Sequence, residues 1–295
     1  MTIIMAGALP PFSLNLWQDV QAMLSYDFMR QAFLAGTTLS VVAGLIGYFV
    51  VLRHQAFAGE SLSDVAFTGA LVGAALGLNP LASLLITTIV VAVVMGGFGE
   101  RLRGRDVAIG TVLAWVLGLG VLFLSLFTAH VSGTGTGFSG VTVLFGNLLG
   151  ISSDQTRIIA FISVVTVLAL TVIVRPLLFA SLDPDVAAAK GVPVRTLGLF
   201  FIVLLAVTVS EATLAVGALL VFALLLLPAA IAHHITTRPY AALALASGLA
   251  VALTWLGITI GFYMGYPSSI CISLLATACY VAVVASSRRG RYISS

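Results

Sequence analysis

Residues 181–195, with the sequence SLDPDVAAAKGVPVR, form a polar segment between two apolar runs, 158–180 and 196–209. Apolar runs of about 20 residues have the length of helices that cross the hydrocarbon core of a bilayer, which is about 30 Å thick. The polar segment therefore predicts a connection that lies in water at a membrane surface. Its own composition predicts a short helix.

Both ends of this short helix are marked by residues that favour helix termini. Asp183 is a natural N-cap, Pro184 suits the first helical position, and Asp185 favours the positive end of the helix dipole. Three alanines continue the helix, Lys190 suits its carboxyl end, and Gly191 ends it. A stiff helix of this kind either binds a partner in water or is only a well-formed connection between the two apolar runs.

The composition places the whole chain in a membrane, because 60% of its residues are hydrophobic and only 8% are charged. The chain is predicted to be an all-α, polytopic transmembrane helix bundle. Its candidate spans are residues 31–52, 57–78, 80–98, 107–129, 157–179, 196–212, 214–235, 240–262 and 267–286. The sixth span is short, so residues 196–235 are either two tight spans or one span with a re-entrant piece. The total is therefore eight or nine.

The basic residues predict the orientation of the chain. With the N-terminus outside and nine spans, eleven of the thirteen Lys and Arg residues fall inside, and only Arg30 and Arg157 fall outside. This distribution follows the positive-inside rule and places both the 181–195 segment and the C-terminus in the cytoplasm. The chain then divides into an interfacial N-terminal segment (1–27), a transmembrane domain (28–286) and a cytoplasmic tail (287–295). Scattered basic residues with a net charge of +3 do not suggest nucleic-acid binding.

Two acidic residues, Glu60 and Asp64, lie within a predicted span, where a charged side chain costs about 2.5–3.5 kcal/mol. They are four residues apart and therefore on one helical face, which Ser61 and Thr68 extend. Carboxylates and hydroxyls with no basic residue nearby in sequence suit a divalent cation or a proton. If the span instead begins later, the acids would merely flank it.

Three further residues are weaker candidates for an ion path. Glu211 is predicted in a turn between the sixth and seventh spans, where it is either exposed at the outer surface or acts as an outer gate for a cation. His233 and His234 lie at the inner end of the seventh span. They could receive a metal ion as it leaves, or be solvated without any further role.

Glycines recur every four residues in two spans, and such series let helix backbones approach closely. Their members are Gly69, Gly73, Gly77, Gly257, Gly261 and Gly265. Series of this kind usually serve packing inside a bundle, and a homodimer interface is the alternative.

The sequence holds none of the short motifs that mark common catalytic sites. HExxH, CxxC and Gly-x-Ser-x-Gly are absent, so the chain is not predicted to be an enzyme. Its single lysine, Lys190, has no Walker A sequence around it. If transport is driven by ATP, the ATPase must therefore be a separate chain. A proton- or sodium-coupled carrier is an alternative, although such carriers often show two similar halves and no internal repeat is evident here.

Several blocks of this sequence resemble the membrane permeases of bacterial metal-ion ABC importers, the ABC-3 type family, which move zinc, manganese or iron. The blocks lie at residues 28–34, 47–53, 60–69, 144–150, 182–192 and 216–230. The resemblance runs from about residue 28 to residue 286, and the most specific parts are 182–192 and the Leu-Pro-Ala-Ala sequence in the last block. An importer of metal chelates, of the siderophore or cobalamin type, is an alternative, but those permeases are usually longer.

The resemblance implies a homodimeric permease in the bacterial cytoplasmic membrane. Its implied partners are a cytosolic ABC ATPase dimer and an extracellular metal-binding lipoprotein or periplasmic binding protein. No permanently bound cofactor is implied, because the divalent metal ion is the substrate. The helix at about 183–190 would dock on the ATPase, and its candidate coupling residues are Asp183, Pro184, Asp185, Ala188, Lys190 and Gly191.

The acidic motif of the second span departs from the family pattern. The family commonly has His where this chain has Asp64, and Asp where this chain has Glu60. A carboxylate in place of an imidazole makes the site harder and more anionic, which favours manganese or ferrous iron over zinc. Alternatively, the delivery protein rather than the permease selects the metal.

Overall fold

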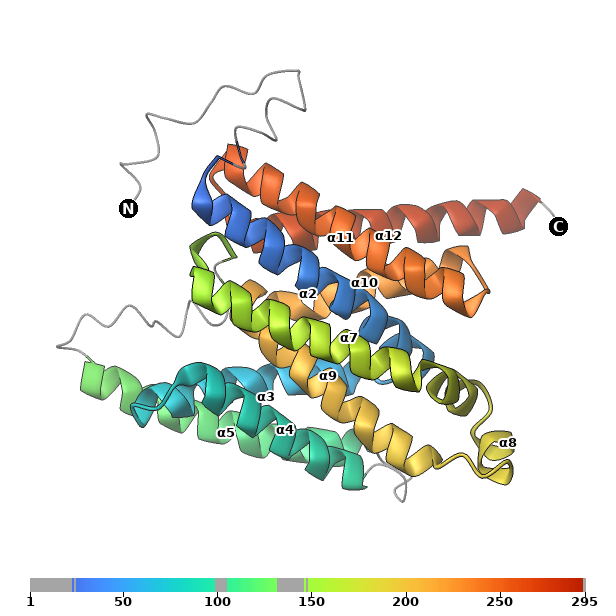
Figure 1. Ribbon diagram of the computed structural model, residues 1–295, viewed down its shortest axis with the longest axis horizontal. Helices are drawn as coiled ribbons and strands as arrows, with labels where there is room; N and C mark the ends of the chain where they lie inside the picture. The colour runs from blue at the N-terminus through green and yellow to red at the C-terminus, as the bar shows by residue number, and fades with distance from the viewer. Residues whose placement is uncertain (1–22, 24, 99–104, 132–145, 147, 294–295) are drawn as a thin grey trace.

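The computed structural model describes residues 23–293, except for 24, 99–104, 132–145 and 147. Within these residues the protein is all-α, as predicted, and has no strands (Figure 1). The elements are α2 (Asp27–Leu52), α3 (Ala56–Ala75), α4 (Pro80–Phe98), α5 (Arg105–Val131), the 3₁₀ turn η1 (Leu148–Gly150), α7 (Ser153–Leu182), α8 (Pro184–Ala189), α9 (Val194–Val216), α10 (Ala218–Ile235), α11 (Pro239–Met264) and α12 (Ser268–Ile293). The predicted interfacial segment 1–27 lies almost entirely outside the described residues.

Each of the nine predicted spans coincides with one long helix. Six of these helices, α2, α4, α7, α9, α11 and α12, are long and apolar enough to cross a membrane. The helices α5 and α10 contain shorter apolar stretches, Ile109–Ser125 and Leu220–Ile235, and α3 carries the two acidic residues Glu60 and Asp64. The multi-pass architecture is thus confirmed, whereas the number of crossings, eight or nine, stays a prediction.

The helices α2 and α9 form the buried centre of the bundle. α2 packs against α7, α10 and α11, while α9 packs against α4 and α7. Figure 1 shows the result: α2, α10, α11 and α12 lie on one side, α3, α4 and α5 on the other, and α7 and α9 lie between them. Large apolar side chains such as Trp115, Phe161 and Val172 point outward on α5 and α7. Such faces suit lipid chains, which are as apolar as these side chains.

Backbones approach closely where glycines take the place of larger residues. A Cβ atom on Gly44 of α2 would lie 2.5 Å from the Cα atom of Ser247 in α11. A Cβ atom on Gly47 would overlap the Leu225 carbonyl of α10. These contacts are the small-residue packing that lets membrane helices associate without a hydrophobic driving force. They hold α2 against α10 and α11.

The members of the two predicted glycine series have two different roles in the structure. Four members pack within the protomer: Gly69 and Gly73 contact α4, and Gly257 and Gly261 contact α12. Gly77 and Gly265 do not belong to these packing faces, because nothing lies within 4 Å of a Cβ atom built on either residue. Each instead follows the end of its helix in the left-handed region, with φ of +69° and +68°.

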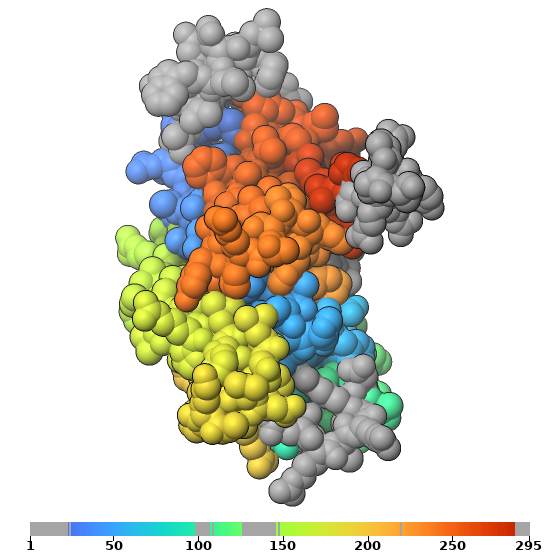
Figure 2. Space-filling view, turned by 90° about the vertical axis from the view of Figure 1, so that its right-hand side faces the viewer, coloured from blue at the N-terminus to red at the C-terminus, as the bar shows by residue number. Residues whose placement is uncertain are grey.

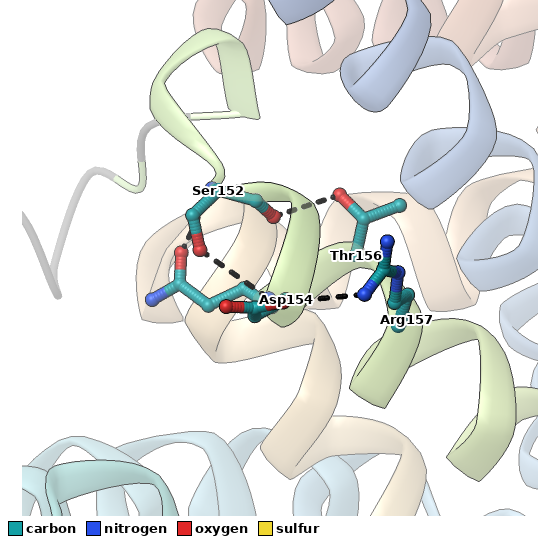
Figure 3. A network of polar contacts seen from close by, with 5 residues as sticks. Ser152, Asp154, Thr156 and Arg157 are labelled. Carbon is teal, nitrogen blue, oxygen red and sulfur yellow. Dashed lines mark hydrogen bonds and ion pairs between the residues drawn. The ribbon is translucent and has the colours of Figure 1, made fainter.

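A polar network fixes the start of α7 (Figure 3). The hydroxyl of Ser152 accepts a hydrogen bond from the backbone N–H of Gln155 at 3.3 Å, and the Gln155 side chain accepts one from the Ser152 N–H at 3.1 Å. This reciprocal arrangement is a capping box, which satisfies two of the free N–H groups at a helix start. The beginning of α7 is therefore fixed locally by its own sequence.

The two arginines predicted on the outer side each have an acidic partner one turn away. Arg157 lies 3.5 Å from Asp154 at the start of α7, and Arg30 lies 3.7 Å from Asp27 at the start of α2. Both pairs are exposed, so they contribute little to stability, but they cancel charge at this end. In Figure 1 these two helix starts lie at the left, opposite α8. The orientation of the chain across the membrane stays a prediction.

Candidate functional site

The helix α8 forms the tip of a hairpin between α7 and α9 at the right of Figure 1. The Oδ1 atom of Asp183 accepts a hydrogen bond from the Val186 N–H at 3.0 Å, so Asp183 caps the helix as its sequence predicts. Pro184 occupies the first turn, and Gly191 follows the C-cap with φ of +80°. The local sequence thus defines both ends of α8.

One face of α8 is anchored and the other is open. Ala187 is completely buried, whereas Asp185 and Ala188 are exposed. The Nζ atom of Lys190 lies 5.5 Å from the ring centre of Phe179 in α7, a cation–π contact that folds the end of α8 back onto the bundle. In Figure 2 the yellow surface of the α8 region lies uncovered on the face toward the viewer, and an open helix face of this kind is suited to contact another protein in water.

The acidic residues of α3 lie on an open face of the protomer. Glu60 is exposed and Asp64 is half-buried. Neither side chain forms an ion pair with a basic residue in the described part of the chain. Two carboxylates one helical turn apart attract cations, and their oxygens are the ligands that hard divalent ions prefer.

The two hydroxyls predicted beside these acids are turned inward. Ser61 is buried, and its hydroxyl donates a hydrogen bond to the Phe57 carbonyl at 2.8 Å. Thr68 is buried against Gly120 of α5, and its oxygen has no hydrogen-bond partner in the described residues. Of the four polar residues predicted to share one helical face, Glu60 and Asp64 therefore remain at the surface.

Sequence reasoning missed Ser63, the immediate neighbour of Asp64. Its buried hydroxyl donates a hydrogen bond to the Ala218 carbonyl at 2.7 Å, in the first turn of α10. This bond fixes α3 next to the turn between α9 and α10, where Gly217 adopts φ of +93° and ψ of 150°. Ser63 is buried whereas Glu60 is exposed, and its contact with α10 cannot be inferred from the spacing of the two acids.

The predicted position of Glu211 is wrong. The helix α9 continues through this residue to Val216, and the chain turns only at Gly217. Glu211 is 3% exposed, and the Ser163 hydroxyl in α7 lies 3.3 Å from both of its carboxylate oxygens. Its carbon atoms help to line a small apolar pocket with residues of α4 and α7. Glu211 is therefore a buried contact between helices rather than an exposed turn residue.

The two histidines do not join the acidic face. The His233 ring stacks on Tyr48 with ring centres 4.5 Å apart, and its Nε2 atom lies 3.2 Å from the Tyr48 backbone oxygen. His234 is exposed, with Tyr280 beside it at 6.2 Å. Among the described residues, no three or more His, Cys, Asp or Glu side chains gather into a group that could hold a metal ion. The histidines and the acids of α3 therefore do not form one site within the described part of the protomer.

Solved structures of membrane transport proteins share this fold. PsaBC from Streptococcus pneumoniae in complex with Fab superposes with a TM-score of 0.77 at 23% sequence identity, covering 90% of this chain and 93% of that chain. An inward-facing conformation of a putative metal-chelate type ABC transporter superposes with a TM-score of 0.68 at 18% identity, covering 95% and 92%. At these identities the likeness concerns the fold.

Sequence comparison identifies the family. The chain is 28% identical over 267 residues to the manganese transport system membrane protein MntC of Halalkalibacterium halodurans, covering 90% of this chain and 89% of that protein. It is 27% identical over 271 residues to the manganese import system permease protein ScaB of Streptococcus parasanguinis, covering 89% and 91%. The profile of the ABC 3 transport family matches residues 25–287. The chain therefore belongs to the ABC 3 transport family and is a multi-pass permease of the cytoplasmic membrane.

Proposed function

We propose that this chain is the permease subunit of an ATP-driven importer of divalent transition-metal ions. The observation that carries the proposal is the open acidic face of α3, formed by Glu60 and Asp64. A membrane helix does not expose charge to lipid at a tolerable free-energy cost, so acidic residues in such helices face a water-filled cavity or a partner. We assign that cavity to the path of the ion.

A second copy of the chain is the partner that this face requires. If two protomers meet with their α3 faces opposed, four carboxylates surround a central path. Carboxylate oxygens are hard ligands, and they favour manganese or ferrous iron over zinc. The names of the MntC and ScaB relatives, which are manganese transport proteins, support manganese among these ions.

We assign ATP hydrolysis to a separate ATPase dimer, and we propose that this dimer docks on α8. α8 is capped, anchored by Ala187 and open on its outer face. The chain has no Walker A sequence, so ATP hydrolysis requires another subunit. A metal-binding protein on the opposite side of the membrane would deliver the ion.

Glu211 receives a different role from the acids of α3. It joins α9 to Ser163 of α7, and these two helices are the arms of the hairpin that ends in α8. A buried hydrogen bond to a carboxyl group contributes about 1.5–3 kcal/mol when the group is charged and about 1 kcal/mol when it is neutral. We assign Glu211 to holding the two arms together rather than to ligating the ion.

The double variant Glu60→Gln with Asp64→Asn should abolish manganese uptake by the assembled transporter in lipid vesicles. The amides keep the size of the side chains but are weak ligands for a hard cation. Uptake of radioactive manganese should fall to the background without loss of assembly. The matched control is Asp27→Asn with Asp154→Asn, which neutralises two exposed acids at the other end of the bundle. Normal uptake kinetics in the first variant would refute the ion path.

Ala188→Pro should detach the ATPase from the permease. Proline in a helix interior removes an N–H donor and costs about 3 kcal/mol, which α8 is too short to absorb. The ATPase should no longer co-purify with this variant, and ATP-dependent uptake should be lost. Ala188→Ser, which keeps the helix and a small side chain, should retain both properties. Unchanged co-purification and uptake in Ala188→Pro would exclude α8 as the docking site.

Glu211→Gln should retain most of the manganese uptake of the parent protein. Glutamine can still accept a hydrogen bond from the Ser163 hydroxyl, so the contact between α7 and α9 persists without the charge. Glu211→Leu removes that contact and should lower the thermal stability of the purified permease. Loss of uptake in a fully assembled Glu211→Gln protein would instead place this carboxylate in the ion path.

A further inference from the structure

Arg53 occupies the turn between α2 and α3, and it contacts both arms of the α8 hairpin. Its Nη1 atom donates a hydrogen bond to the Ser181 hydroxyl at 3.3 Å, near the end of α7. Its guanidinium carbon lies 5.6 Å from the ring centre of Phe201 in α9. One side chain from the α2–α3 turn thus reaches α7 and α9 together.

Both contacts lie close to α8. Ser181 precedes the N-cap Asp183 by two residues, and its hydroxyl donates to the Leu177 carbonyl while it accepts from Arg53. On α9, a Cβ atom on Gly198 would lie 3.3 Å from Arg53 Nη2, so the absence of a side chain there leaves room for the guanidinium. The guanidinium is therefore enclosed between the two arms just behind α8.

On its other side, Arg53 belongs to a tightly bonded turn. The Arg53 N–H donates to the Phe49 carbonyl at 2.9 Å, and the Gln55 N–H donates to the Val50 carbonyl at 2.8 Å. His54 between them adopts φ of +53°, and α3 begins at Ala56. Two hydrogen bonds and a left-handed residue make this turn compact, so a displacement of Arg53 moves the start of α3.

Aromatic packing joins the same end of α2 to the neighbouring helices. Phe201, which stacks under Arg53, lies 5.9 Å from Phe49 of α2, and Phe49 lies 5.4 Å from Tyr48. Tyr48 in turn stacks on His233 of α10. Ring contacts of this kind are directional and well packed, so the end of α2 follows α9 and α10 rather than sliding past them.

We propose that Arg53 is a positioning residue that carries movement of the α8 hairpin to the acidic face of α3. The inference rests on the proposed function, because Arg53 can transmit movement only if α8 moves with the ATPase. Glu60 lies one helical turn beyond the turn that holds Arg53, so a shift at α8 changes the position of its carboxylate. Arginine suits this task because its planar group stacks on a ring and donates hydrogen bonds at the same time, which lysine does not do.

The test compares two distances in the full transporter, assembled with its ATPase in lipid vesicles. The starting protein carries Cys271→Ala and Cys279→Ser, so that single cysteines can receive spin labels. One label at Thr196→Cys reports the α8 hairpin, and one at Phe57→Cys reports α3. Pulsed electron paramagnetic resonance then measures each distance between the two copies, without nucleotide and with ATP and vanadate. Each label is placed in the parent, in Arg53→Gln and in Arg53→Lys.

In the parent, nucleotide should change both distances. In Arg53→Gln the distance at 196 should still change, while the change at 57 should disappear, and manganese transported per ATP should fall about tenfold, within the range of coupling between sites. Arg53→Lys keeps the charge but not the planar group. Its change in distance at 57 and its manganese transported per ATP should lie between those of the parent and those of Arg53→Gln. The control Arg175→Gln removes an exposed arginine near the same end of α7 and should behave as the parent.

Three results would overturn the inference, and they are distinguishable. A normal change at 57 in Arg53→Gln would show that movement reaches α3 by another route. Loss of the change at both positions would show that Arg53 merely maintains the hairpin. No change at 196 in the parent would refute the docking role of α8 itself, and with it the basis of this proposal.

Discussion

Two carboxylates on the open face of a membrane helix set the strongest physical constraint on this protein. A charged side chain in a membrane helix is costly, by about 2.5–3.5 kcal/mol at the centre of the bilayer. Neither Glu60, in the second turn of α3, nor Asp64 has an ion-pair partner in the described residues. The rest of α3 is protected, because α4 and α5 cover its second half and Ser63 is bonded to α10. The acidic face is the part of α3 that would line water, and the proposed central path between two copies would provide that water.

The structure separates the place where energy would enter from the place where the ion would pass. α8 lies at the tip of a hairpin whose arms are joined by Glu211 and Ser163 deeper in the bundle. The acids of α3 lie on another helix, and Arg53, in the turn that precedes α3, contacts both arms of the hairpin. A transporter needs such a connection, because a ligand or nucleotide can shift an equilibrium only through contacts that differ between the two states.

Part of the fold and of the candidate site could be predicted from the sequence, and each success or failure has its own physical reason. The helices were predictable because a bilayer imposes the length of apolar runs, and α8 because Asp183, Pro184 and Gly191 act locally. Glu211 was misplaced because a polar residue between apolar runs resembles a turn, whereas Gly217 is the residue that ends α9. Ser63, Arg53 and the inward turn of Thr68 depend on contacts with helices distant in sequence, which spacing along one helix does not reveal.

The most direct test is to locate manganese in crystals of the assembled permease by anomalous X-ray scattering at the manganese edge. The account predicts a peak between the two copies, with oxygen ligands from Glu60 and Asp64 of each protomer. The same peak should be absent from the Glu60→Gln, Asp64→Asn protein. A peak beside Glu211 or the histidines of α10, with none at α3, or a dimer whose α3 faces point to lipid, would contradict the account.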